Sequence, residues 1–568
     1  MGVVRRLEIN HFRGIAILDW RPAPGVNCLI GPGDSCKTTI LDALDLCLGA
    51  RRNLSMTDAD FHNLDVRKPI EISVTIGRLN DGLKNLESYG LYLRGFDPKS
   101  GAVHDEPDVG LETVLTLRLK VEADLEPSWT LYSVRASDQG QSRGLSWSDR
   151  SSISPTRLGA FADHNLTWGR ASILNKVSDE TITASAALAD LARSAREAFG
   201  QQAEAGLPVA LRVVLVAAVQ LGVPVGSVVK AMLDSQSVSF SGGTIALHSE
   251  RGVPLKSLGL GSKRLLVAGL QRAAAATTPI VLVDEIEHGL EPHRIIRLID
   301  ALGAKDSNPP LQVFMTTHSP VAVRELNANQ IYTVRSIEGR HYALRASDSG
   351  DVAGTIRRFP DALLARSIVV CEGATEVGLI RGLDQASSMP SLTARATALV
   401  DGGGEEVFKR ALAFRNLGYR VAVLHDSDKI STPDIKTVFE TRGGASFAWS
   451  AGCCLEEELF RSLSDASALA MLEQAVQRRG DKFIDDQIRS ASAARHSLAS
   501  CRAGLTAEAR VIIGTASKAK SSGWYKSVSE MESVARDIVG PDLANAAKPF
   551  RDTIDGLFNW IADGAKRS

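Results

Sequence analysis

The chain has 568 residues, a length that predicts about three or four structural units and excludes a single small module. Hydrophobic residues make up 44% and charged residues 23% of the sequence, so large packed cores can form and the composition argues against global disorder. With 65 Lys and Arg against 66 Asp and Glu, the formal net charge of -1 gives no whole-molecule attraction to nucleic acid or to an anionic membrane. Any contact with DNA must therefore come from local basic patches.

No segment has the length and hydrophobicity of a transmembrane helix. The longest apolar stretch, residues 209–225, is broken by Arg212 and Gln220, and a membrane span needs about 18 or more uninterrupted apolar residues. The N-terminal segment lacks the apolar region of a secretory signal, so we expect a cytoplasmic protein without membrane contact. The seven cysteines have no metal-type spacing, which argues against a zinc site or a disulfide framework.

The first candidate site is a phosphate-binding loop near the N-terminus. An apolar run leads into Gly-Pro-Gly-Asp-Ser-Cys-Lys-Thr at residues 31–38, and a helical pattern follows. In such a strand-loop-helix setting, main-chain N–H groups hold phosphates, the lysine reaches the β and γ oxygens, and the threonine binds Mg²⁺. The residues expected to contact the nucleotide are Gly31, Gly33, Asp34, Ser35, Lys37 and Thr38. Taken alone, this segment fits a plain Gly/Pro turn equally well.

One residue of this loop departs from the phosphate-loop pattern. Cys36 stands where the last glycine is expected, and its Cβ and thiol crowd a backbone that glycine lets pass close to the phosphate. We expect ATP still to bind through Lys37 and Thr38, with slow hydrolysis.

Later segments supply the remaining parts of a nucleotide site. One apolar strand ends in Asp284 and Glu285, which fits an aspartate in the Mg²⁺ shell and a glutamate that polarises the attacking water. A second buried strand is followed by His318, placed to contact a γ-phosphate. A glycine-rich turn around Gly261 opens a helix whose N-terminus a second copy of the chain could offer to that phosphate.

The C-terminal part carries a cluster of carboxylates. One β-run ends in Glu372, with Glu376 on the helix that follows, and a later β-run ends in Asp426 and Asp428. Carboxylates at the carboxyl ends of neighbouring parallel strands converge on one crevice. Because four clustered carboxylates repel one another, we expect a divalent metal, and hard oxygen ligands suit Mg²⁺ or Mn²⁺. The acidic triplet 456–458 adds to this cluster, although alone it equally fits a solvated helix start.

The order of the N-terminal pieces resembles that of an ABC/SMC-type ATPase. The pieces are a Leu-x-Ile-x-x-Phe-Arg-Gly motif at residues 7–14, Walker A, a long insert, a signature-like turn, Walker B with Glu285, a D-loop-like segment at 289–292, and His318. In that family ATP lies between two heads, so the resemblance implies a homodimer. The Ala/Leu-rich helical segment 171–235 is the candidate dimerisation element. The signature-like turn lacks the Ser-Gly-Gly of the family.

The glutamate at one strand end and the Asp-x-Asp on a later strand resemble the Toprim fold of topoisomerases, primases and related nucleases. With the ATPase upstream, the whole chain resembles the OLD (overcoming lysogenisation defect) family of ATP-dependent endonucleases, which includes the A subunit of the Gabija defence system. The resemblance implies two metal ions that activate a water and stabilise the leaving 3′-oxygen. Their implied ligands are Glu372, Glu376, Asp426, Asp428 and either Glu456 or Glu458.

A lysine late in the chain also matches this family. Gly-Trp-Tyr-Lys at residues 523–526 resembles the setting of a lysine in OLD enzymes, and Lys526 could neutralise charge on the phosphate during cleavage. The alternative interpretation is a surface lysine close to DNA phosphates. Lys518 and Lys520 fit contacts with the DNA backbone.

We therefore predict an α/β chain with an ABC/SMC-like ATPase domain, a helical dimerisation insert and a C-terminal Toprim nuclease domain with helical additions. The expected boundaries are 1–170 and 236–360 for the two parts of the ATPase domain, 171–235 for the helical insert, and 361–568 for the Toprim domain, with a helical insert at about 463–508.

The predicted function is a metal-dependent DNA endonuclease or nickase gated by the ATPase domain and acting in anti-phage defence. Its expected cofactors are ATP with Mg²⁺, and Mg²⁺ or Mn²⁺ at a two-metal nuclease site. Its expected partners are DNA, a second copy of the chain and a UvrD-like helicase. The alternative is an ATP-switched DNA-binding or repair scaffold of the RecF/SMC type without nuclease activity.

Overall fold

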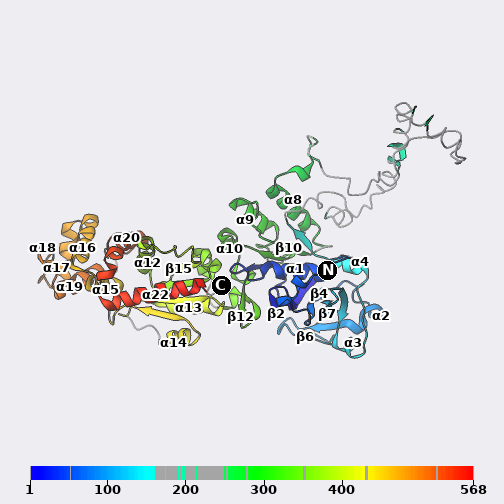
Figure 1. Cartoon of the computed structure of the whole chain (residues 1–568), viewed down its shortest axis with the longest axis horizontal. Coiled ribbons are helices and arrows are strands. Elements are labelled where there is room, and N and C mark those ends of the chain that lie inside the picture. The colour runs from blue at the N-terminus through cyan, green and yellow to red at the C-terminus, as the bar shows by residue number, and fades with distance from the viewer. Residues whose placement is uncertain are drawn as a thin grey trace. The chain divides into compact units, whose positions relative to one another are not determined.

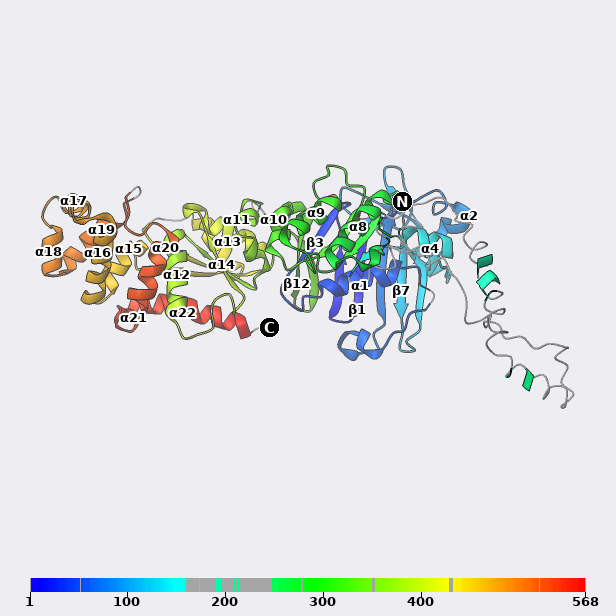
Figure 2. The same cartoon turned by 90° about the horizontal axis from the view of Figure 1, so that it is seen from above.

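The computed structural model of the chain divides into two units (Figures 1 and 2). The first unit comprises Met1–Asn27 and Thr38–Thr316, and the second comprises Cys28–Lys37 and Thr317–Ser568. The described residues are 2–51, 53–159, 248–250, 254–276, 279–349, 353–428, 433–519 and 522–566, together with isolated positions between 160 and 253. Apart from a few such positions, the predicted helical insert 171–235 lies outside the described residues.

The first unit contains an antiparallel sheet with the strand order β6-β5-β7-β4-β1-β2, and β8 pairs with β7. Its strands are β1 (Val3–Phe12), β2 (Ile15–Trp20), β4 (Ile70–Gly77), β5 (Leu93–Phe96), β6 (Val103–His104), β7 (Glu112–Val121) and β8 (Pro127–Tyr132). The short helices α2 (Leu86–Tyr89), α3 (Val134–Asp138) and α4 (Trp147–Ile153) belong to the same unit. In β1 buried residues alternate in part with half-buried ones, as in a sheet with one face on the core.

Three parallel strands of the first unit carry residues of the nucleotide site. They are β9 (Thr156–Leu158), β10 (Ile280–Val283) and β11 (Gln312–Thr316), with β10 between the other two. Every residue of β10 and β11 is buried, as expected for strands covered on both faces. The helices of this region are α1 (Lys37–Leu48), α8 (Leu260–Ala273) and α9 (Pro292–Ala301), and α8 packs against α9.

The second unit begins at Cys28 within β3 (Val26–Ile30), and this strand pairs in parallel with β12 (Ile331–Ile337). Strand β12 also pairs with the antiparallel β13 (Arg340–Arg345). Two short helices follow β11 and β13, namely α10 (Pro320–Glu325) and α11 (Ala353–Arg358).

A separate sheet of four parallel strands follows, in the order β15-β14-β16-β17. Its strands are β14 (Ser367–Cys371), β15 (Thr397–Asp401), β16 (Arg420–His425) and β17 (Ala445–Ala448). The helices that accompany the sheet are α12 (Ala374–Ala386), α13 (Val407–Asn416), α14 (Pro433–Thr441) and α22 (Lys548–Lys566). Because the chain continues from β14 to β15 on one side and then crosses to β16 on the other, the carboxyl ends of β14 and β16 border the point where a crevice forms in open α/β sheets.

Helices make up the rest of the second unit (Figure 1). They are α15 (Leu455–Ser462), α16 (Asp465–Arg479), α17 (Asp481–Ala491), α18 (Leu498–Ala503), α19 (Ala507–Ser517), α20 (Val528–Val534) and α21 (Gly540–Asp542). Together with α12 and α22 they share one core with the parallel sheet, and this core includes the fully buried Trp524 and Tyr525. Among the described residues, no helix combines the length and hydrophobicity needed to cross a membrane.

Helix α12 packs against the α20 region through glycine. A Cβ on Gly382 would lie 2.3 Å from the carbonyl oxygen of Glu532 and 2.5 Å from Cβ of Ala535. Because the main chain of α20 cannot move aside cheaply, we expect Gly382→Ala to lower the free energy of unfolding of the second unit by ~2 kcal/mol. Urea unfolding measures this change.

The matched control is Gly269→Ala on α8, where an added Cβ meets no atom within 4 Å. Because Gly269 is an exposed glycine inside a helix, alanine there is expected to be neutral or to stabilise the protein by ~0.5–1 kcal/mol. Equal effects of the two substitutions would contradict the close packing of α12.

Candidate nucleotide site and candidate metal centre

The phosphate-loop residues of the second unit form a loop closed by Lys37. The Nζ atom of Lys37 donates hydrogen bonds to the carbonyl oxygens of Gly31 and Pro32, at 3.1 and 2.8 Å, and to Oγ of Ser35 at 3.2 Å. These are weaker acceptors than a phosphate oxygen, because an ionised acceptor strengthens a hydrogen bond. The loop therefore holds an ammonium group ready for a triphosphate.

Cys36 has a left-handed backbone conformation, with φ of 65°. An L-residue with a Cβ pays roughly 1–2 kcal/mol for this conformation, whereas glycine adopts it freely. The preference for glycine at this place in the loop thus has a backbone cause in this chain, in addition to the crowding expected from the sequence. Asp34 in the same loop also has a positive φ, of 61°.

Asp284, directly after β10, accepts hydrogen bonds from two threonines of the first unit. Its Oδ1 accepts from Oγ1 of Thr38 at 3.1 Å and from Oγ1 of Thr316 at 2.7 Å. Thr38 and Asp284, which the sequence predicted as Mg²⁺ ligands from segments 246 positions apart, are therefore in direct contact. Two oxygen donors side by side fit the oxygen-rich coordination that Mg²⁺ requires.

An arginine that the sequence had not indicated lies beside this pair. The guanidinium of Arg157, on β9, contacts Oδ1 of Asp42 at 2.7 Å and Oδ2 of Asp284 at 3.6 Å. Arg13, in the N-terminal motif, contacts the other oxygen of Asp42 at 2.6 Å. These ion pairs attach helix α1 to β9 and to the turn after β1, and they fix the start of α1 next to Asp284.

Glu285 has an exposed side chain on a strained backbone. Its φ is 46°, in the left-handed region, and its side chain is 58% exposed. The N–H of Glu285 donates to Oγ1 of Thr316 at 2.7 Å, and its carbonyl oxygen accepts from the buried Arg264 of α8. His288 lies close by, with Nδ1 at 4.0 Å from Oε2 of Glu285. Hydrogen bonds to the main chain of Glu285 thus fix the residue, while its carboxylate oxygens are exposed to solvent.

The other two predicted residues of the nucleotide site have these positions. His318 follows β11 and is exposed, as a residue offered to a ligand must be. Gly261 lies in the first turn of α8, against the carbonyl oxygen of Gly289. Helix α8 begins at Leu260, so Gly259 is its N-cap and Ser262 lies in its first turn.

Four carboxylates meet at the carboxyl edge of the four-stranded sheet. Glu372 follows β14, Asp426 follows β16, Glu376 lies on α12, and Glu456 lies in the first turn of α15. Oε2 of Glu372 accepts the N–H of Asp426 at 2.8 Å, and Oδ1 of Asp426 accepts the N–H of Leu455 at 3.1 Å. The three peptide segments that bear these residues are therefore joined by the carboxylates themselves.

Two carboxylates of this group are buried, the other two are half-buried, and all four repel one another. Burial, followed by the charges of Glu376, Glu372, Glu456 and Asp428, raises the pKa of Asp426 to about 9. Burial, followed by the charges of Glu456 and Glu372, raises the pKa of Glu376 to about 7. Glu376 and Glu456 are each only 3% exposed. Such a cluster is stable in its ionised form only beside a compensating cation.

Lys526 supplies one positive charge to this group. Its Nζ lies 2.7 Å from Oε1 of Glu456. Burial lowers the pKa of Lys526, but the charge of Glu456 outweighs it, so the pKa lies above the ordinary lysine value. The two preceding aromatic residues anchor the segment: Trp524 donates to the side chain of Gln487, and Tyr525 donates to the carbonyl oxygen of Met471 at 2.6 Å.

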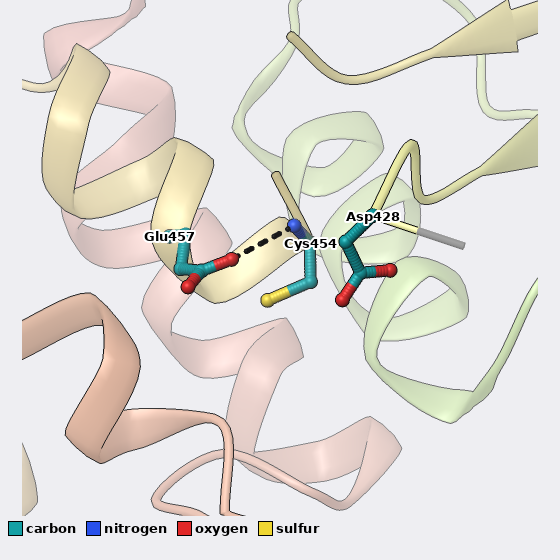
Figure 3. A group of neighbouring side chains, drawn as sticks. All are labelled: Asp428, Cys454 and Glu457. Carbon is teal, nitrogen blue, oxygen red and sulfur yellow. Dashed lines mark hydrogen bonds between the residues drawn. The ribbon is translucent and has the colours of Figure 1, made fainter. Parts of the chain in front are cut away.

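A second group of ligand atoms lies beside the first. The carboxylates of Asp428 and Glu457 and the thiol of Cys454 all lie within 4.8 Å of one another (Figure 3). Glu457 also accepts the N–H of Cys454, which caps helix α15. Lys518 approaches this group, with Nζ at 2.9 Å from Glu457 and 3.8 Å from Asp428. Two acidic groups therefore lie side by side at this edge of the sheet, each with its own lysine.

Glu458 turns away from both groups. Its carboxylate accepts hydrogen bonds from the N–H and Oγ of Ser450, at 3.0 and 3.2 Å, and from Oγ of Ser462 at 2.7 Å. Successive residues of a helix are rotated by about 100°, so the three glutamates of the triplet cannot share one direction. The resemblance implied Glu456 or Glu458, and the sequence left open which of the three glutamates binds metal. Glu457 contacts Lys518 and lies close to Asp428.

The donor set at this edge fits a divalent cation. It consists mainly of carboxylate oxygens, the hard ligands that Mg²⁺ and Mn²⁺ prefer, and the cluster repels itself without a positive charge. Cys454 adds one softer ligand atom, which suits Mn²⁺ better than Mg²⁺.

Comparison with known proteins identifies two domains in the chain. Residues 26–324, more than half of the chain, match the family described as "AAA domain, putative AbiEii toxin, Type IV TA system". Residues 363–428 match the "Overcoming lysogenization defect protein-like, TOPRIM domain" family. The fold and the sites thus define an ATPase domain joined to a Toprim domain. The chain belongs to this AAA family and carries a TOPRIM domain like that of overcoming lysogenization defect (OLD) proteins, and the predicted mixed α/β fold with these two domains is confirmed.

Individual relatives match shorter parts. The DNA replication and repair protein RecF of Porphyromonas gingivalis is 37% identical over 79 residues, which are 14% of this chain and 21% of RecF. The OLD nuclease of Thermus scotoductus is 32% identical over 100 residues, which are 17% of this chain and 19% of that protein. The chain thus matches about a fifth of the length of these relatives.

Among solved structures, the chain is similar to the Smc head domain of Pyrococcus furiosus. That structure contains an extended coiled coil and is bound to the C-terminal domain of ScpA. The similarity has a TM-score of 0.36 and 13% identity, and it covers 63% of this chain and all of that one.

The backbone strain at Cys36 generates a prediction. Cys36→Gly is expected to stabilise the ATP-free protein by ~1 kcal/mol, because glycine adopts the positive φ without a Cβ penalty. We also expect kcat for ATP hydrolysis to rise at least ~3-fold. Thermal unfolding and phosphate release measure these changes.

Cys36→Ala separates the backbone effect from the thiol, because alanine keeps the Cβ. If Cys36→Ala raises kcat as much as Cys36→Gly does, the thiol and not the backbone limits turnover. If Cys36→Gly changes neither ATP affinity nor kcat, Cys36 does not impair the site.

The raised pKa of Asp426 generates a second prediction. Between pH 4 and 9 the folded protein holds a proton on Asp426 that the unfolded chain has lost, so the contribution of this group to stability falls as pH rises. Asp426→Asn keeps the acceptor oxygen but removes the charge. In EDTA, we expect it to raise Tm by about 5 °C at pH 8.5, from ~2 kcal/mol of relieved repulsion, and by much less at pH 5.

The control is Asp552→Asn, which changes an exposed aspartate of α22. It is expected to leave Tm unchanged at both pH values. A Tm gain for Asp426→Asn that is equal at pH 5 and pH 8.5 would contradict the raised pKa.

Proposed function

We propose that this chain is a metal-dependent DNA endonuclease or nickase whose cleavage is governed by ATP in its ATPase domain. The observation that carries the proposal is the convergence of four carboxylates, two of them only 3% exposed, at the carboxyl edge of the Toprim sheet. Such a cluster costs stability, so a structural role does not account for it, and strongly raised pKa values are typical of functional sites.

We assign the metal-binding roles to the two acidic groups. Glu372, Glu376, Asp426 and Glu456 would hold one divalent cation, and Asp428 with Glu457 would hold a second. Bound there, Mg²⁺ or Mn²⁺ supplies an activated water and charge compensation for the leaving oxygen. Of the two alternatives from the sequence, we select Glu456, because Lys526 contacts it and Glu458 is satisfied by two serines.

The two lysines suit the negative charge of a phosphodiester. Lys526 is 41% exposed at its side chain and Lys518 is 35% exposed, so both ammonium groups remain accessible beside the carboxylates. An ammonium group next to the reacting phosphate stabilises charge that builds up during cleavage. Although the chain has no net positive charge, these two ammonium groups, together with bound metal ions, would offset the charge of a phosphodiester, and this supports DNA as the substrate.

For the ATPase domain, we propose that Lys37 exchanges its carbonyl partners for phosphate oxygens. Thr38 and Asp284 would hold the Mg²⁺ of the nucleotide, and Glu285 would orient the attacking water. His318 and the α8 turn at Gly261 would face the γ-phosphate, the latter from a second copy of the chain. A homodimer is therefore part of the proposal.

The biological setting is an extension of the same proposal. The similarity to the OLD nuclease of Thermus scotoductus supports a nuclease, and we propose a role in anti-phage defence in the cytoplasm, with a UvrD-like helicase as a candidate partner. The similarity to RecF favours a second function, an ATP-switched DNA-binding or repair scaffold that does not cut DNA.

Plasmid cleavage separates the two functions. We expect the protein to nick or linearise supercoiled DNA with Mn²⁺ or Mg²⁺ but not in EDTA, and ATP to change the rate. Supercoiled DNA that stays intact with every divalent metal, while DNA binding still responds to ATP, would favour the scaffold.

Glu456→Gln is expected to lower the cleavage rate at least ~100-fold, because it removes a proposed metal ligand and the partner of Lys526. Glu458→Gln is the matched control on the same helix, and it is expected to keep at least about half of the activity. Circular dichroism and thermal unfolding check that both variants fold. Loss of cleavage in Glu458→Gln with full activity in Glu456→Gln would reverse the assignment.

A further inference from the structure

Helix α8 carries a buried arginine whose contacts are main-chain oxygens. Arg264 is 2% exposed. Its Nη1 donates to the carbonyl oxygens of His288 at 2.6 Å and Glu285 at 3.2 Å, and its Nη2 donates to those of Glu285 at 3.3 Å and Asp284 at 3.5 Å. One guanidinium group thus donates hydrogen bonds to three carbonyl groups of the turn after β10.

This turn needs such support because of the conformation of Glu285. A φ of 46° is unfavourable for a residue with a long side chain, and such a conformation persists only where the surrounding structure holds it. Thr316 holds the N–H side of Glu285 at 2.7 Å, and Arg264 holds the carbonyl side. Because the carboxylate is largely exposed, its direction is set by the backbone conformation and not by packing.

The same helix contacts the next part of the turn at its N-terminal end. A Cβ on Gly261 would lie 3.0 Å from the carbonyl oxygen of Gly289 and 2.9 Å from Leu290. Ser262 accepts a hydrogen bond from Arg294 of α9 at 3.3 Å. The glycine-rich start of α8 and the segment 284–294 are therefore attached at several points, so a shift of α8 along its axis must displace the turn.

A purely structural role is a poor explanation for Arg264. Burial of a guanidinium is costly and lowers its pKa, and an apolar side chain of similar volume usually stabilises a core at least as well. What an arginine adds is a rigid fork of donors with fixed geometry. That property matters where the positions of several carbonyl groups must be fixed together.

We propose that Arg264 is a positioning residue for ATP hydrolysis, which couples the position of helix α8 to the direction of the Glu285 carboxylate. The inference rests on the proposed role of Glu285. When the glycine-rich start of α8 engages a nucleotide, Arg264 fixes the turn with the carboxylate toward the attacking water. Without the arginine, the turn relaxes and the water is less well oriented.

The test compares Arg264→Met, which fills the same space without donors, with Arg272→Met on the same helix. Arg272 pairs with Asp306 at 2.7 Å and its side chain is 40% exposed. We expect Arg264→Met to lower kcat for ATP hydrolysis by about 30-fold or more, because small errors in position are costly for the chemical step. ATP affinity is expected to stay within ~3-fold, and Arg272→Met to leave both unchanged.

If Arg264→Met does not fold, Arg264→Lys is measured by the same criteria. A single ammonium cannot span the carbonyls of Glu285 and His288 as the fork does, so a loss of at least ~5-fold in kcat is expected. A variant that loses ATP affinity and kcat together would indicate a structural role and overturn the proposal.

A double-mutant cycle with Glu285→Gln tests the route of action. Single-turnover hydrolysis is expected to be no slower in the double variant than in Glu285→Gln alone, because Arg264 then has nothing left to position. Multiplying losses would overturn the proposal. A wild-type protein that hydrolyses no ATP would instead contradict the proposed ATPase function, and an unimpaired Glu285→Gln variant would contradict the role of Glu285.

Discussion

The repulsion among buried carboxylates at the edge of the Toprim sheet is the constraint on which the second unit depends. The main-chain N–H of Asp426 donates to the carboxylate of Glu372, and that of Leu455 donates to the carboxylate of Asp426. Lys526 offsets the negative charge of Glu456. These contacts fix where β14, β16 and α15 end relative to one another. Aromatic residues buried in the helical part then hold Lys526 in place. The surrounding helices thus keep these carboxylates close together, although their negative charges repel one another.

The ATPase domain follows a similar principle on a smaller scale. Glu285, the carboxylate proposed to orient the attacking water, also stands at the end of a buried parallel strand, and Thr316 and Arg264 hold it through its main chain. In both places the buried strand brings the acidic residue to the sheet edge, and side chains from other elements set its direction. Glu285 and Cys36, two of the residues proposed to act on the nucleotide, both have a positive φ.

Much of this architecture was accessible from the sequence. The apolar runs before Asp284, Glu372 and Asp426 are short and bounded, which indicated parallel strands, and parallel strands necessarily bring their carboxyl ends to one edge. The proximity of Thr38 to Asp284 across 246 positions was predictable because the phosphate-loop and strand-end motifs each supply a ligand to the same nucleotide-bound Mg²⁺. The contacts of Arg264, Arg157 and Lys518 were not, because an isolated basic residue in a helix or strand has no local pattern that distinguishes it from a surface charge.

The sequence by itself determined the order of the motifs, the two-domain class and the strand ends at which the acidic residues stand, because these follow from hydrophobic runs and from residue types at fixed spacing. Only the tertiary structure decided which glutamate of the 456–458 triplet faces the cluster, since rotation around α15 sends each one in a different direction and its neighbours come from distant segments. The tertiary structure also revealed the positive φ of Cys36, because this angle depends on the path of the loop between β3 and α1. The direction of a side chain and the backbone angles of a loop depend on contacts between distant segments, which local sequence patterns do not encode.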